Sequence, residues 1–344
     1  MMYNRSWAYG LLLLALSLSG CRKGIVMEEG TPIRFGVSEV MVKAEFVSPN
    51  GADYLIKQGN KASVYGTWTG SSTTETVFNG VTLTCESASS WTYDNALTRN
   101  WKNSGTYHFK AVFPIREDVG SSSNGTHLTV PYSMHTEAGN VDLMVASVSR
   151  DMSEGYLGPV DLVFQHATSA IRFLFRKGES TSADYKLEML EMQHLRTVGD
   201  LILEADDLTE DSPLTNDSWY LASSYRPETI HHWEAEDESQ CKPIGDTYSS
   251  FTGYDWYFCI PQDLTVSAEE SHPAVHFRVK MSGGVSVENT LDIPDTDIHG
   301  DPVRWEPGKV YTYYIGVTPQ TSSVYVRVSS WDAAYVSVDE IIFD

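Results

Sequence analysis

The stretch TYHFKAVF, residues 106–113, indicates the fold class, because apolar side chains recur in it at every second position. These residues are Tyr107, Phe109, Ala111 and Phe113. Successive side chains of an extended strand point to opposite faces, so a period of two predicts a strand with one apolar face. Residues 171–175, 275–281 and 311–317 repeat the pattern. Short strands bounded by Gly, Pro, Asn and Ser clusters predict an all-β chain built as sandwiches.

Two other stretches bear on the organisation of the chain. Residues 183–204, ADYKLEMLEMQHLRTVGDLILE, contain good helix formers, yet Tyr185, Leu187 and Met189 alternate, and we expect a strand. The polar stretch SRDMSEGYLGP, residues 149–159, lies between two apolar alternating runs. We therefore expect two β-sandwich domains, one over residues 31–155 and one over residues 156–344.

The first twenty residues have the design of an export signal. Arg5 precedes an apolar run that ends near Leu18, shorter than the ~20 residues that span a bilayer. The run continues into Leu18-Ser19-Gly20-Cys21, which resembles a bacterial lipobox, where the cysteine is acylated and the chain is cut directly before it. The alternative is a plain signal peptide with a chance cysteine. We expect residues 1–20 to be a lipoprotein signal peptide, Cys21 to be lipidated, and residues 21–30 to form a tether.

The chain is acidic and poor in cysteine. It has 24 Lys and Arg against 46 Asp and Glu, a formal net charge of −22. Such a surface repels phosphate backbones, so nucleic-acid binding is disfavoured. Apart from Cys21 there are three cysteines, Cys85, Cys241 and Cys259. We expect buried free thiols and at most one disulfide, for which Cys241 and Cys259 are the nearer candidates.

The sequence contains no recognisable catalytic signature. G-x-S-x-G, H-E-x-x-H, the P-loop and the dinucleotide-binding glycine motif are all missing. The neighbours His231 and His232 would point to opposite faces of a strand, which does not suit a shared metal site. His108 and His276 are expected on the polar faces of their strands, as solvated side chains. We expect a protein that is not an enzyme and has no cofactor.

One acidic loop partly fits a calcium-binding pattern. Positions 1, 3, 7 and 12 carry carboxylates and position 6 a glycine, namely Asp295, Asp297, Asp301, Glu306 and Gly300. However, position 5 is His299, position 8 is Pro302, and the flanking segments have the strand period. An acidic connection between strands is the preferred interpretation, with a calcium site as the alternative.

Five tryptophans in or near polar sequence leave two interpretations open: Trp91, Trp101, Trp219, Trp233 and Trp256. Exposed rings would suit glycan binding, whereas buried rings would fill a sandwich core. The sequence does not separate the two.

Several longer stretches share a family resemblance. They are SSWTYDNALTRNWKNSGTYHFKAVFP at residues 89–114, VDLMVASVSRDM at 141–152, PVDLVFQHATSAIRFLF at 159–175, YFCIPQDL at 257–264 and WEPGKVYTYYIGV at 305–317. Together with the lipobox and the opening segment TPIRFGV, they resemble the fimbrillin family, the Mfa-like and related lipoproteins of anaerobic Gram-negative bacteria of gut and mouth.

This resemblance implies two transthyretin-like β-sandwich domains in tandem and a role in type V pili or surface adhesion. It also implies a lipidated precursor at the outer membrane, from which a protease specific for arginine or lysine removes the first strand. The open groove then accepts a strand from a neighbouring pilin subunit, by donor-strand exchange. The family has no catalytic residues.

In this sequence, residues 33–46 are the candidate removable strand. Residues 335–343, YVSVDEIIF, are a further β-prone run that either closes its own domain or is the candidate donated strand. In a stalk subunit, the residue at which the protease cleaves should follow the first strand. Arg34 instead lies within the pattern of that strand. Lys43 is the other candidate for processing. The sequence therefore leaves the role of the chain in the pilus undecided between a stalk, an anchor and a tip subunit. The rival function is a surface glycan-binding lipoprotein of a polysaccharide uptake system, with host or microbial glycans or proteins as ligands.

Overall fold

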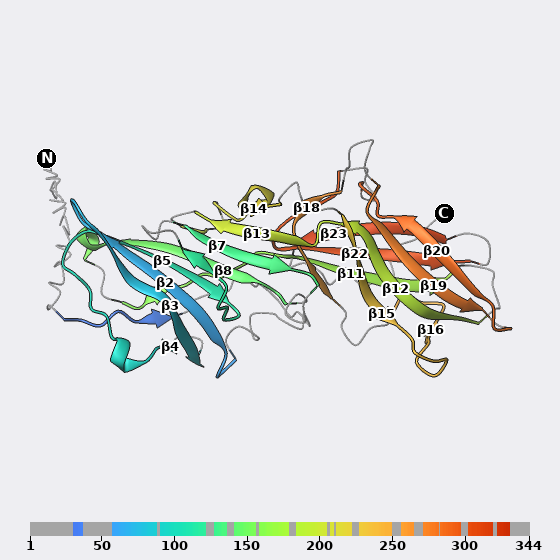
Figure 1. The fold of residues 1–344 in the computed structure, drawn as a ribbon, viewed down its shortest axis with the longest axis horizontal. Coiled ribbons are helices and arrows are strands. Elements are labelled where there is room, and N and C mark those ends of the chain that lie inside the picture. Colours follow the sequence, from blue (N-terminus) through green and yellow to red (C-terminus); the bar gives the residue numbers. More distant parts are fainter. Residues whose placement is uncertain are drawn as a thin grey trace, which may run out of the picture.

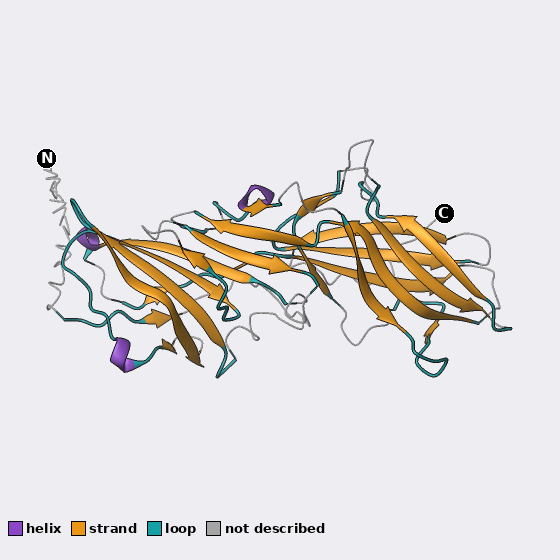
Figure 2. Cartoon of the chain, in the orientation of Figure 1, coloured by secondary structure: helices purple, strands orange, loops and turns teal. Residues whose placement is uncertain are grey.

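The computed structural model describes residues 30–36, 57–87, 90–121, 127–135, 141–155, 158–178, 184–204, 207–209, 211–221, 227–249, 256–264, 271–281, 283–296, 302–318 and 322–330. Within these ranges the chain is nearly all β, with three short 3-10 turns, η1 (Asn95–Leu97), η3 (Met152–Glu154) and η4 (Asn216–Ser218). The strands form an elongated molecule, with the early strands at one end and the late strands at the other (Figure 1 and Figure 2). The prediction of an all-β fold is confirmed.

The first sheet has eight strands in the order β10-β8-β5-β2-β3-β4-β1-β9. Their bounds are β1 (Phe35–Gly36), β2 (Lys61–Thr69), β3 (Thr74–Ser87), β4 (Ser90–Thr92), β5 (Thr106–Phe113), β8 (Met144–Asp151), β9 (Val160–Asp161) and β10 (Gln165–His166). Only residues 162–164 separate the two edge strands β9 and β10, so the edges lie close together. The sheet therefore curls around a core of its own.

This first core contains the apolar residues of the stretch that predicted the fold. Tyr107, Phe109, Ala111 and Phe113 are at most 2% exposed, as the period of two predicts. The opposite face of β5 is covered as well, because Lys110 is only 2% exposed. His108 and His276, expected to be solvated, are both half-buried.

A middle sheet covers the outer face of the first sheet. It has the order β14-β13-β7-β6, with bounds β6 (Gly120–Ser121), β7 (Leu128–Ser133), β13 (Val198–Leu203) and β14 (Trp219–Tyr220). Between the two sheets, Val112 and Val145 of the first pack in one core with Val130 and Leu201 of the middle sheet. The antiparallel pair of β7 and β13 thus joins segments that lie far apart in the sequence.

The chain crosses from the first sheet to the later sheets after β10. The described part of the polar stretch 149–159, where we expect a domain seam, holds the end of β8 and η3 and leads into β9. Both β9 and β10 return to the first sheet, although they follow residue 155. The division into domains over residues 31–155 and 156–344 stays a prediction.

The late strands form two sheets that face each other as a sandwich. The third sheet has the order β17-β11-β22-β23, with bounds β11 (Ser169–Lys177), β17 (Tyr257–Cys259), β22 (Lys309–Val317) and β23 (Ser322–Ser330). The fourth has the order β15-β12-β19-β20, with β16 paired to β12; the bounds are β12 (Tyr185–Leu195), β15 (Glu228–Glu234), β16 (Lys242–Ile244), β19 (Ala274–Met281) and β20 (Ser286–Asp292). A further pair joins β18 (Gln262–Asp263) to β21 (Arg304–Trp305). The expectation of strands over residues 183–204 is confirmed by β12 and β13.

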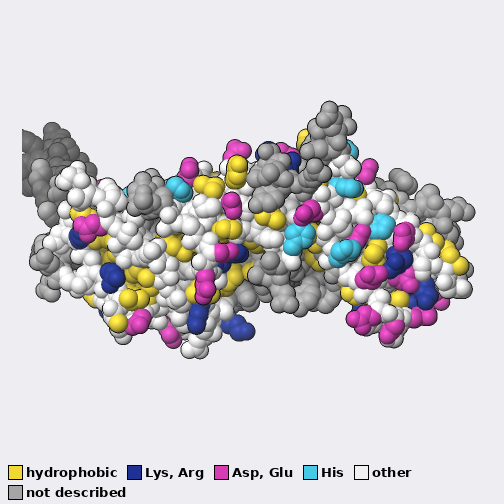
Figure 3. Space-filling view, in the orientation of Figure 1, with side chains coloured by type: hydrophobic (Ala, Val, Ile, Leu, Met, Phe, Trp, Pro, Cys, Tyr) yellow, Lys and Arg dark blue, Asp and Glu magenta, His cyan; other side chains and the backbone are white. Residues whose placement is uncertain are grey.

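The core of this sandwich is rich in aromatic rings. Phe173 and Tyr313 of the third sheet stack with ring centroids 5.5 Å apart, and Phe175 meets Phe277 of the fourth sheet edge-on at 5.3 Å. On the outer face of the fourth sheet, basic side chains lie among acidic ones (Figure 3). Arg278, for example, pairs with Glu188 at 3.5 Å and with Glu288 at 3.7 Å.

The cysteines behave as the sequence predicts. Cys85, Cys241 and Cys259 are buried free thiols, so the disulfide considered between Cys241 and Cys259 does not form. Burial raises the pKa of Cys85 and of Cys259.

Several predicted features lie outside the described residues. They are the signal peptide, Cys21 and most of the tether, residues 37–46 with Lys43, Asp297 and Asp301, and the candidate donated strand at 335–343. Among the described residues, no helix is both long enough and apolar enough to cross a bilayer.

Candidate strand-docking site

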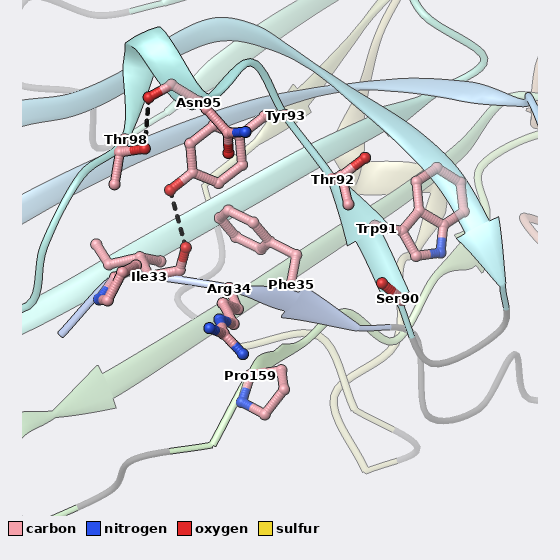
Figure 4. Close-up of a pocket in the computed structure, with 11 residues that line it drawn as sticks. Ile33, Arg34, Phe35, Ser90, Trp91, Thr92, Tyr93, Asn95, Thr98 and Pro159 are labelled. Atoms are coloured by element: carbon pink, nitrogen blue, oxygen red, sulfur yellow. Dashed lines mark hydrogen bonds between the residues drawn. The ribbon is translucent and has the colours of Figure 1, made fainter.

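The opening segment, residues 31–36, is inserted into the first sheet between two other strands. β1 pairs antiparallel with β4, where Phe35 lies opposite Trp91, and parallel with β9, where Phe35 lies opposite Val160. An isolated bridge joins Pro32 to Asn100. Figure 4 shows the segment between β4 and Pro159.

Backbone hydrogen bonds hold the opening segment on both flanks. On one side the amides of Ile33 and Trp101 donate to the carbonyls of Arg99 and Thr31, at 2.8 and 3.0 Å. On the other side the amides of Val160 and Leu162 donate to the carbonyls of Arg34 and Gly36, at 2.6 and 2.9 Å. Loss of the segment would leave backbone donors and acceptors without partners on both flanks.

Alternate side chains of the opening segment fill the first core. Ile33 is 1% and Phe35 2% exposed, whereas Arg34 between them is exposed. The ring of Phe35 meets Phe78 and Phe109 edge-on, with centroids 5.3 and 5.5 Å apart. These are the favoured edge-to-face contacts of aromatic pairs.

Tyr93, which directly follows β4, contacts the opening segment with both its ring and its hydroxyl. Its ring meets Phe35 edge-on at 6.1 Å, and its hydroxyl donates to the carbonyl of Ile33 at 2.8 Å (Figure 4). A groove of about 430 Å³ runs beside the segment, between Pro32 and Arg34 on one side and Ser90 and Asn95 on the other. The site is therefore a slot for one extended strand, with a groove along it.

Of the two predicted processing residues, only Arg34 is described. Its side chain is exposed, but its carbonyl accepts a hydrogen bond from Val160, and both neighbours are buried in the core. A cut after Arg34 would also leave Phe35 attached to the rest of the chain. Lys43 lies outside the described residues, and both assignments stay predictions.

The predicted calcium ligands are only partly described. Glu306 accepts a hydrogen bond from Arg304 Nε at 2.9 Å, and the carbonyl of Asp295 accepts one from the amide of Val303. The described part of the chain contains no group of three His, Cys, Asp or Glu side chains that could hold a metal ion. His231 instead pairs with Glu191, with 2.8 Å between Nδ1 and Oε2.

The tryptophans mostly belong to the cores. Trp91, Trp101, Trp219 and Trp256 are between 3% and 6% exposed. Trp233 is half-buried against the sandwich core. For four of the five, the structure therefore selects the interpretation in which the rings fill the protein interior.

The sequence did not predict where the opening segment docks. Its partners β4 and β9 lie more than 50 and more than 120 residues further along the chain. The one signal for β9 is the apolar alternation of Val160, Leu162 and Phe164, all at most 1% exposed.

Comparisons with known proteins agree on one family and one fold. The sequence model of the fimbrillin-like family matches residues 48–331. A fimbrial protein from Bacteroides vulgatus superposes with a TM-score of 0.52 at 12% identity, covering 88% of this chain and 100% of the other. A protein provisionally described as a cell adhesion protein, from Bacteroides ovatus, gives 0.52 at 14% identity, covering 88% of this chain and 97% of the other. A search of curated proteins gives no match.

Proposed function

The chain belongs to the fimbrillin-like family, and from this premise we propose that it is a lipid-anchored subunit of a type V pilus that assembles by strand exchange. The family places it among fimbrial and cell-adhesion proteins of the cell surface. We assign it a structural role in adhesion, as a stalk, anchor or tip subunit, and no catalytic activity.

The opening segment is the observation that carries the proposal. It contributes a strand with hydrogen bonds on both flanks and two core side chains, Ile33 and Phe35. Its release would open a slot with unpaired backbone groups and two empty side-chain sites. An extended strand from a second subunit could satisfy both, which is the principle of donor-strand complementation.

The sequence of residues 335–343 suits the role of donor. Ile341 and Phe343 are two residues apart, like Ile33 and Phe35, so a donor strand running in the same direction would place matching side chains in the two sites. Of the two processing candidates, we favour Lys43 over Arg34, because a cut at Lys43 would release the whole described segment. The glycan-binding alternative draws no support from the tryptophans, since four of the five are buried.

Lipidation predicts a clear change in location. We expect Cys21→Ala to abolish acylation and to move the protein out of the membrane fraction, because the acyl chains supply the anchoring energy. Cell fractionation with radiolabelled palmitate measures both effects, and Cys241→Ser serves as the matched control that keeps its lipid. A Cys21→Ala protein that still sediments with the outer membrane would refute the lipoprotein assignment.

Release of the opening segment predicts polymerisation. Replacing residues 41–46 with the recognition sequence of a site-specific protease allows the purified chain to be cut after the segment. We expect SDS-resistant oligomers after cutting, none in the uncut protein, and none in a cut protein that lacks residues 335–344. A cut protein that loses the segment and stays monomeric at high concentration would count against strand exchange.

A further inference from the structure

The groove beside the opening segment has one positive charge and no acidic side chain among the described residues that line it. The eleven residues, drawn in Figure 4, include Arg34 and no Asp or Glu. The whole chain, in contrast, has a formal net charge of −22. The volume of about 430 Å³ lies within the usual range of small-molecule sites, ~300–1,000 Å³. The groove is thus a positively charged recess with room for a small ligand.

Arg34 lies on the side of β1 that faces away from the core. Phe35 of β1 lies opposite Trp91 of the antiparallel strand β4. The same register places Arg34 opposite Thr92. Because side chains alternate along a strand and Phe35 is buried, Arg34 and Thr92 take the outer face. Ser90, two residues before Thr92, takes this face as well, so the arginine and two hydroxyl groups share one face of the pair.

Three polar side chains of the groove have no partner of their own. Within the described ranges, the side chains of Arg34, Ser90 and Asn95 make no hydrogen bond and no ion pair. Arg34 offers five N–H donors, Ser90 a hydroxyl, and Asn95 an amide with two donors and an acceptor. A ligand can therefore bind these groups without breaking a contact within the described protein.

Two threonines add hydroxyl groups to the lining. Thr92 donates to a carboxylate oxygen of Glu86 at 3.3 Å, and Thr98 donates to the carbonyl of Asn95 at 2.6 Å. Each hydroxyl oxygen keeps lone pairs that can accept a hydrogen bond. The nearby carboxylate of Asp94 accepts a backbone amide of η1 at 2.9 Å. Glu86 and Asp94 thus have contacts of their own, and neither is paired with the arginine of the groove.

The groove suits a small polar ligand better than an extended peptide. The opening strand β1 already pairs with β4 on one flank and with β9 on the other. A peptide therefore finds no free strand edge here while β1 is inserted, and recognition has to come from side chains. The exposed rings of Pro32 and Pro159 supply apolar walls, and the hydroxyl and amide groups suit a ligand rich in hydroxyls. Arginine adds planar recognition of a carboxylate.

We propose that this groove binds an acidic sugar, such as a uronic or sialic acid unit, with its carboxylate on Arg34 and its hydroxyls on Ser90, Asn95 and the two threonines. The site does not depend on the tryptophans as exposed platforms. Such a ligand would contact β1, β4 and the η1 turn at the same time. If the proposed function holds, it therefore bridges the opening segment to its neighbours and slows release of that segment.

Isothermal titration calorimetry of the purified chain, which lacks only the signal peptide and carries Cys21→Ser, tests the site. The probes are glucuronate and N-acetylneuraminate as acidic sugars, glucose as a neutral sugar, and glutamate as a carboxylate without a sugar ring. We expect at least one acidic sugar to bind saturably. Glucose and glutamate are expected to bind at least about tenfold more weakly, because each lacks one half of the recognition.

Variants assign the binding to the groove. Arg34→Gln is expected to weaken binding of the acidic sugar at least about tenfold, because it removes the charge-assisted hydrogen bonds. Asn95→Ala, which leaves the opening segment untouched, also weakens it, whereas Lys57→Gln changes an exposed cation outside the groove and has no effect. Equal thermal unfolding of the variants shows that the fold is intact. Absence of saturable binding, equal binding of glutamate, or binding unaffected by Arg34→Gln would overturn the proposal.

The link to strand release has a separate readout. In the chain cut at residues 41–46, a saturating acidic sugar is expected to slow oligomer formation, and to have no such effect in the Arg34→Gln protein. Unchanged oligomer formation with the sugar bound would overturn the bridging of β1 to its neighbours. A cut chain that binds the sugar and yet forms no oligomers in sugar-free buffer would support the site and count against strand exchange alone.

Discussion

Replacing Phe35 with alanine is expected to lower the free energy of unfolding by about 3–5 kcal/mol, the usual cost of a buried phenylalanine. The ring is 2% exposed and meets Phe78, Phe109 and Tyr93 edge-on. Alanine leaves a cavity in the first core beside these rings. Denaturant titration followed by tryptophan fluorescence measures the loss.

The matched control lies next to it in the same strand. Arg34→Ala removes an exposed side chain and is expected to change stability by no more than about 0.5 kcal/mol. Equal effects of the two substitutions would mean that the opening segment is not part of the first core.

Replacing His166 with leucine is expected to lower the free energy of unfolding by about 3–5 kcal/mol, because it removes the side-chain partner of the buried carboxylate of Asp142. His166 Nδ1 lies 2.9 Å from both carboxylate oxygens of Asp142, which is 1% exposed. The leucine removes this partner of the carboxylate, whereas the hydroxyl of Thr168 still donates to Asp142 Oδ1 at 3.4 Å. The pair therefore stabilises the point where the chain leaves the first sheet.

Contacts around this pair join three sheets. The amide of Ala167 donates to the carbonyl of Leu143, and Trp219 Nε1 of the middle sheet donates to the carbonyl of Ala167 at 3.0 Å. The hydroxyl of Ser169 donates to the carbonyl of Glu306 at 2.8 Å. Loosening residues 165–169 is thus expected to affect all three sheets.

Two variants separate the charge effect from a packing effect. Asp142→Leu/His166→Leu removes both partners and is expected to regain much of the loss, since apolar replacement of a buried pair is often close to neutral. His135→Leu breaks the exposed pair with Glu228 and is expected to cost at most about 1 kcal/mol. If His166→Leu behaves like His135→Leu in thermal and denaturant unfolding, the buried pair does not stabilise the crossing.

The period of two was sufficient to find the long strands. It placed β5, β11, β19 and β22, because each buries one face and alternation is a local property of the sequence. It also outweighed helix propensity over residues 183–204, where Tyr185 and Leu187 are buried. The presence of a strand can therefore be predicted from the alternation of residues two positions apart in the sequence.

Pairing between distant segments was not readable in this way. Nothing in a short window indicates that β7 pairs with β13 or that β1 lies parallel to β9. Lys110 shows the same limit, since a lysine at an alternate position predicts a solvated face, yet its side chain is buried at 2% exposure. Packing between segments that are distant in the sequence decides whether such a side chain is buried. The tryptophans are another example, since four of the five are buried although they lie in or near polar sequence.

The candidate site was predictable from the family resemblance and only partly from the residues. The resemblance pointed to the opening segment, and the alternation of Ile33 and Phe35 around exposed Arg34 agrees with an inserted strand. The flanking partners Trp101 and Val160 became known only from the fold.

Native mass spectrometry of strand replacement tests the central claim most directly. The chain is cut within the inserted recognition sequence at residues 41–46 and mixed with an excess of an isotopically heavy peptide of residues 28–38. We predict that the heavy peptide replaces the original strand, whereas the same peptide with Phe35→Asp does not. A cut chain that takes up neither peptide, or both equally, would contradict a replaceable strand held by its core side chains.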